Sequence, residues 1–149
     1  MTSTPDAALA ALAARLQAAL PVAVPGLAVI DDEPSGDGDQ LGDAGHVAVV
    51  LDDRGVPDGL NGAGPFYRET LARLECLVRG ASAAERRTRL RAVLDAVEAA
   101  LNADRTLGGE ILGCTWEALD PQRVPVEGGA DVMGEIILVT LEFETDTEL

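Results

Sequence analysis

The segment from Ser82 to Leu101 constrains the fold more than any other part of the chain, because it predicts a long helix with one buried stripe. Ser82 followed by Glu85 has the pattern of a capping box, in which both side chains bond to free backbone N–H groups at a helix N-terminus. Apolar residues then recur every three or four positions, so another layer must cover this face. They are Leu90, Val93, Leu94, Val97 and Leu101.

The stretch ALNADRTLGGEILG, from Ala100 to Gly113, predicts the end of this helix at Asn102 and a turn containing Asp104, Gly108 and Gly109. A glycine pair can cradle a phosphate or simply reverse the chain. This pair follows a helix instead of preceding one, so its amides do not join the helix N-terminus that phosphate binding uses. The residue pattern therefore favours a structural turn.

A second helix is predicted near the N-terminus, where Thr4 can cap and Pro5 occupies the first helical position. We expect Pro21 to end it. Leucines recur along one face of this segment at positions 9, 12, 16 and 20.

Short runs rich in β-branched residues predict strands at 26–31 and 46–52, and alternation predicts two more at 110–119 and 132–145. In the third of these, Leu112, Cys114, Trp116 and Ala118 alternate with Ile111, Thr115 and Glu117. In the last, Ile137, Val139, Leu141 and Phe143 share a face.

The segment FYRETLARLECLVRG, from Phe66 to Gly80, fits both a helix and a strand, and propensity alone leans towards a helix. If it is a strand, the element order is α, β, β, β, α, β, β. That order fits an α+β two-layer sandwich, a mostly antiparallel sheet of four or five strands with two helices packed on one face. The chain of 149 residues, 47% of them hydrophobic, is expected to form a single domain.

Two loops rich in Gly, Asp and Pro separate the early strands, an acidic one at 31–45 and a second at 52–65. The aspartates of the first loop alternate in part as calcium ligands do, but the loop lacks the glutamate at the twelfth position of an EF-hand. We expect a solvated, flexible loop; ion binding and contact with a partner or channel are the alternatives.

The formal net charge of -15 argues against a surface that binds nucleic acid, because such binding needs basic groups that displace counterions from phosphates. Four arginines nevertheless gather in the first half of the 82–101 helix. We expect them to pair with carboxylates of the same or a neighbouring chain. They are Arg86, Arg87, Arg89 and Arg91.

Candidate catalytic groups are few, so we expect no enzyme, no cofactor and no metal site. His46 is the only histidine, and it is interpreted as structural. Cys76 and Cys114 lie in apolar stretches, which predicts buried thiols. The N-terminus has no basic region before its apolar segment and no apolar run approaches about 20 residues, so we expect no membrane contact and synthesis in the cytosol.

One combination of these elements resembles a known family. The helix ending Leu101-Asn102-Ala103-Asp104, followed by Leu107-Gly108-Gly109 and a strand, then the final strand GEIILVTLEFET, is similar to phage tail terminator, or tail completion, proteins and their counterparts in gene transfer agents. The match covers roughly the last 85 residues, and the first 60 only by the order of elements. The resemblance implies that 66–80 is a strand and that the glycine pair is a joint.

The resemblance also implies a function. Such a protein forms a homo-oligomeric ring, typically a hexamer, on the head-proximal end of the tail tube, where it stops tube polymerisation, meets a head-side connector or stopper protein and lets double-stranded DNA pass. It would be found in the tail of a virion or particle, and in the bacterial cytoplasm during assembly. A stopper, a tube subunit and a calcium-dependent binding module are the alternatives. Channel-facing or neighbour-facing positions are expected at Asp37, Asp39, Asp43, Asp52, Asp53 and Asp58.

Overall fold

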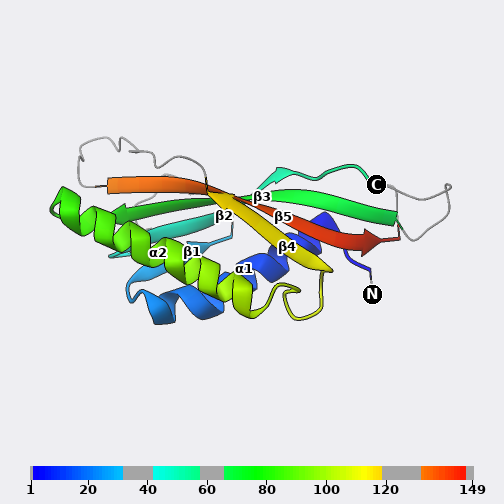
Figure 1. Ribbon diagram of the computed structural model, residues 1–149, viewed down its shortest axis with the longest axis horizontal. Helices are drawn as coiled ribbons and strands as arrows, with labels where there is room; N and C mark the ends of the chain where they lie inside the picture. The colour runs from blue at the N-terminus through cyan, green and yellow to red at the C-terminus, as the bar shows by residue number, and fades with distance from the viewer. Residues whose placement is uncertain (1, 32–41, 58–65, 119–131, 147–149) are drawn as a thin grey trace.

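The computed structural model of the chain describes residues 2–31, 42–57, 66–118 and 132–146. Within these ranges the chain forms two helices and five strands (Figure 1). In chain order they are α1 (Pro5–Ala23), β1 (Leu27–Ile30), β2 (Gly45–Asp53), β3 (Phe66–Arg79), α2 (Ala83–Ala103), β4 (Gly113–Ala118) and β5 (Val132–Thr145).

The five strands form one sheet in the order β1-β2-β3-β5-β4. The β1–β2 pair is parallel and the other three pairs are antiparallel. Both helices of the described ranges lie on the same side of the sheet (Figure 1). The expected α+β two-layer sandwich is therefore confirmed.

The core fills the space between the sheet and the two helices. Leu12 and Leu16 of α1, Val93 and Val97 of α2, and Leu74 of β3 are all fully buried there. Burial of apolar surface is the main force that holds such layers together. One continuous cluster of apolar side chains thus joins α1, α2 and the sheet.

The segment that fitted two secondary structures is a strand, β3, and it lies at the centre of the sheet. It pairs with β2 on one side and with β5 on the other, and the pairing with β5 runs from Phe66↔Thr145 to Arg79↔Val132. Ala72, Leu74 and Cys76 point into the core, as the alternating pattern predicted. Long-range pairing on both edges overrides the helix propensity of this segment.

Helix α2 begins as predicted, with one difference at its cap. The Ser82 side chain accepts a hydrogen bond from the Glu85 N–H at 3.1 Å, while the Glu85 carboxylate accepts from the Ala81 N–H at 3.0 Å instead of from Ser82. The predicted stripe is buried, except that Leu94 is only half-buried and Ala100 joins it.

Helix α1 does not end at Pro21, so that prediction is wrong. The helix continues to Ala23 with Pro21 in its last turn. Proline has no N–H, so Pro21 cannot donate a hydrogen bond to the Gln17 carbonyl one turn earlier. Gln17 is exposed, so water can bond to that carbonyl instead. The Val24 N–H then closes the helix on the Leu20 carbonyl at 2.8 Å.

The length of α1 also corrects the expectation that no apolar segment approaches a membrane span. The helix has 19 residues and an 18-residue window with a mean hydropathy of 1.2, so it is long and apolar enough to span a bilayer by length and composition, and it is the one such helix in the described ranges. In this fold, however, Ala8, Leu12, Leu16 and Leu20 are fully buried against the sheet and α2.

Two strand boundaries differ from the sequence expectation. Strand β2 extends through Asp52 and Asp53, which were assigned to a loop, with a bulge between Leu51 and Asp53. Strand β4 starts only at Gly113, so the expected start at 110 is wrong: Leu112 is 54% exposed and Ile111 is buried. These two residues belong to the preceding turn, where strand alternation does not apply.

Candidate functional site

The joint between α2 and β4 is a tight turn that is held by a hydrogen bond between two of its own residues. The Asp104 carboxylate accepts a hydrogen bond from the Gly108 N–H at 2.8 Å. Leu107, Gly108 and Gly109 all have positive φ, of 51°, 73° and 90°. Glycine adopts this conformation without steric cost, and Leu107 is held in it by burial of its side chain. Because Asp104 of the same turn already accepts a hydrogen bond from the Gly108 N–H, the glycine pair acts here to reverse the chain.

The six aspartates expected to face a channel or neighbour do not form one site. Asp37, Asp39 and Asp58 lie outside the described residues. Asp43 is exposed just before β2.

The other two aspartates are bound within the fold. The Asp52 Oδ1 lies 2.9 Å from Arg73 Nη1, and Arg73 also contacts Glu75 Oε1 at 3.1 Å. Asp53 accepts the Gly55 N–H at 2.8 Å and so closes the turn that leaves β2. Both carboxylates therefore stabilise the end of β2.

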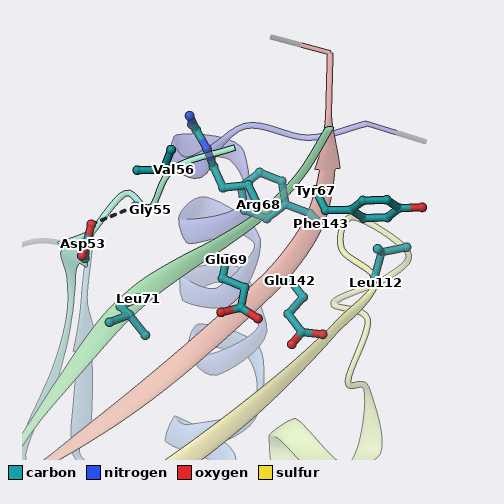
Figure 2. A pocket seen from close by; sticks show the side chains of 10 residues that line it. All are labelled: Asp53, Gly55, Val56, Tyr67, Arg68, Glu69, Leu71, Leu112, Glu142 and Phe143. Atoms are coloured by element: carbon teal, nitrogen blue, oxygen red, sulfur yellow. Dashed lines mark hydrogen bonds between the residues drawn. The ribbon is translucent and has the colours of Figure 1, made fainter. Parts of the chain in front are cut away.

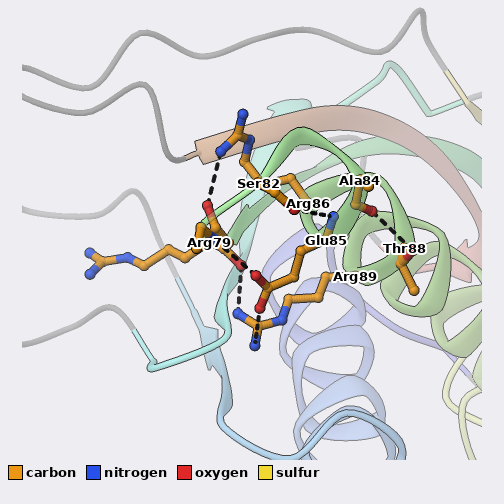
Figure 3. A network of polar contacts seen from close by, with 9 residues as sticks. Arg79, Ser82, Ala84, Glu85, Arg86, Thr88 and Arg89 are labelled. Carbon is orange, nitrogen blue, oxygen red and sulfur yellow. Dashed lines mark hydrogen bonds and ion pairs between the residues drawn. The ribbon is translucent and has the colours of Figure 1, made fainter.

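The four arginines of α2 divide into two pairs. Arg86 donates to the Gly80 carbonyl at 2.9 Å, and Arg89 donates to the Arg79 carbonyl and pairs with Glu85 (Figure 3). These two side chains tie the start of α2 to the end of β3. Arg87 and Arg91 are exposed and have no ion pair within the described ranges. We call this second pair the arginine face.

The single histidine and both cysteines are buried. Burial, and then the charge of Arg79, lower the pKa of His46 below its usual 6.5. Burial, and then Glu135, raise the pKa of Cys76 to about 12. Burial also raises the pKa of Cys114. The charge of Arg105 lowers this pKa in part, and the charge of Asp104 raises it. The prediction of buried, free thiols is confirmed, and neither thiol is activated as a nucleophile.

A groove of about 620 Å³ crosses the end of the molecule where β3 begins and β5 ends. We call it the end groove (Figure 2). Glu69 of β3 and Glu142 of β5 are direct cross-strand partners, and their side chains point the same way. The wall of the end groove combines carboxylates with exposed apolar side chains. The main lining residues are Asp53, Val56, Tyr67, Glu69, Leu112 and Glu142.

Sequence reasoning did not find this groove, because its residues come from four separate segments. Glu69 and Glu142 become neighbours only through the register of β3 and β5. Leu112 was expected to belong to a strand, and it lies in the turn before β4. The one available signal was that Tyr67 and Glu69 alternate with the inward residues of β3, which placed them on the outer face.

No protein-family model and no curated protein matches the chain, so the site is interpreted from its own geometry. Among the described residues, no group of three or more His, Cys, Asp or Glu side chains is placed to hold a metal ion.

Proposed function

We propose that this chain is a structural subunit of a phage-like or gene-transfer-particle tail, and that it forms a ring at the head-proximal end of the tail tube. The proposal starts from the residues around the α2–β4 joint, which resemble tail terminator proteins. In this role the ring ends tube polymerisation, contacts a head-side connector and leaves a passage for double-stranded DNA.

One structural observation carries the proposal. The arginine face lies on α2 near its N-terminus, whereas the acidic end groove lies where β3 begins, and these are opposite ends of the long axis (Figure 1). A ring needs two different surfaces on each subunit that fit one another head to tail. Opposite charge on two such surfaces favours this pairing and disfavours contacts between like ends.

The net charge supports the same role. With 26 acidic and 11 basic residues, a ring of such subunits surrounds DNA mainly with negative charge. Repulsion between that charge and the phosphates lets DNA slide without sticking. Asp43, exposed just before β2, is the aspartate of the described ranges that we place towards the channel or a neighbouring ring, because Asp52 and Asp53 are bonded within the fold. Asp43→Asn is expected to leave the folded domain intact.

Native mass spectrometry of the purified chain, with and without its tail tube protein, tests the proposal. We expect a hexamer, either alone or on the tube. Open tubes formed by this chain would instead identify a tube subunit. A strict monomer under both conditions would refute the ring.

A further inference from the structure

We propose that the end groove of one subunit binds the first half of α2 of a second copy of this chain, so that Glu69 and Glu142 pair with the neighbour's Arg87 and Arg91. This inference rests on the proposed ring and names the contact that closes it.

The acceptor side is a pair of carboxylates that repel each other within the subunit. Glu69 and Glu142 face one another across β3 and β5, and both are exposed. Like charges directly opposite on two strands are destabilising. Neither has an ion-pair partner in the part of the chain that the structure describes. A pair of cations from outside the subunit would remove this repulsion.

The groove also offers apolar surface. Three of the four large hydrophobic side chains exposed in the described ranges line it: Val56 at 84%, Tyr67 at 46% and Leu112 at 54%. Apolar surface gathered in one place, with polar residues beside it, is typical of a protein interface.

The donor side matches this surface in spacing and in composition. Arg87 and Arg91 are one helical turn apart, about 6 Å, which is close to the roughly 5 Å between directly opposed residues on two strands. Two guanidinium groups can therefore reach two carboxylates at once. The half-buried Leu94 lies beside the two arginines in a shallow groove of about 700 Å³.

The placement of the two surfaces selects a second copy as the occupant. They are different patches at opposite ends of the molecule, so one contact leaves a free groove on one subunit and a free arginine face on the other. Contacts of this kind propagate and close into a ring when the rotation between subunits allows it.

Two double variants test the contact in the full-length chain. Arg87→Ser with Arg91→Ser removes the donors and keeps the groove, whereas Glu69→Gln with Glu142→Gln removes the acceptors and keeps the arginine face. The controls are Arg105→Ser, an exposed arginine just beyond the C-terminus of α2 that bonds to Asn102 and lies over the Trp116 ring, and Glu98→Gln with Glu117→Gln, two exposed glutamates outside the groove. Circular dichroism and urea unfolding establish that every variant folds.

Native mass spectrometry and sedimentation then measure assembly, with tube protein present if the wild type requires it. We expect each double variant to self-associate roughly tenfold or more weakly than the wild type, while both controls assemble normally. An equimolar mixture of the two variants should stop at a heterodimer, because only one productive contact remains. Reversing all four charges in one chain, with Arg87→Glu, Arg91→Glu, Glu69→Arg and Glu142→Arg, should restore the ring.

The outcomes separate this contact from the ring itself. If folded double variants form the same ring as the wild type, the proposed contact is wrong and the ring stands. If the wild type forms only two-fold dimers that both variants disrupt, the contact stands and the ring is wrong. If the wild type assembles neither alone nor on the tube, both proposals fail.

Discussion

Replacing Gly108 by alanine should destabilise the protein through backbone conformation alone. Gly108 has a φ of 73°, and a Cβ added there would meet no atom within 4 Å. An L-residue in the left-handed region costs about 1–2 kcal/mol. Alanine also restricts the unfolded chain, which returns about 0.4–1 kcal/mol. The net loss of unfolding free energy is therefore about 1 kcal/mol, or roughly 2–4 °C in Tm for a chain of this size.

Gly113→Ala is the matched control for this prediction. Its added Cβ would also meet nothing within 4 Å, but its φ lies outside the left-handed range. The unfolded-state contribution is the same in both variants, so it cancels in the comparison. Urea unfolding should therefore place Gly108→Ala about 1–2 kcal/mol below Gly113→Ala. A difference below about 0.5 kcal/mol would show that the left-handed backbone at Gly108 is not what the glycine supplies.

Three further predictions follow from buried or capping groups. The folded His46 has a pKa below 6.5, because burial and then Arg79 disfavour its charged form, so the unfolded state takes up the proton first as the pH falls. Wild-type unfolding free energy should thus fall below about pH 6.5 more steeply than that of His46→Gln, and parallel pH profiles would contradict this. Cys76, with a pKa of about 12, and the buried Cys114 should resist iodoacetamide at pH 8.5 in native buffer and react in urea, and mass spectrometry that finds rapid native labelling would overturn that burial. Ser82→Ala should cost about 1 kcal/mol in urea unfolding by removing the cap on α2, whereas Ser82→Asp should retain it.

Local sequence signals determined most of the secondary structure. The α2 cap and stripe and the β5 alternation each depend on residues within one segment, and the structure has each of them. The errors occur where a segment ends. Pro21 is tolerated in a last helical turn, Asp52 and Asp53 extend β2 past its apolar run, and Leu112 belongs to a turn.

Only the tertiary structure decided β3 and the end groove. The Phe66–Arg79 segment has the propensity of a helix, and pairing with β2 and β5 on its two edges makes it a strand. The same pairing places Glu69 beside Glu142, 73 positions away in the chain. The packing of α2 against the end of β3 divides the four arginines of the helix into a bonded pair and an exposed pair. Periodicity reports which face of its own element a residue occupies. Which residues from distant segments meet on that face depends on strand register and helix packing, and these are set by contacts between segments.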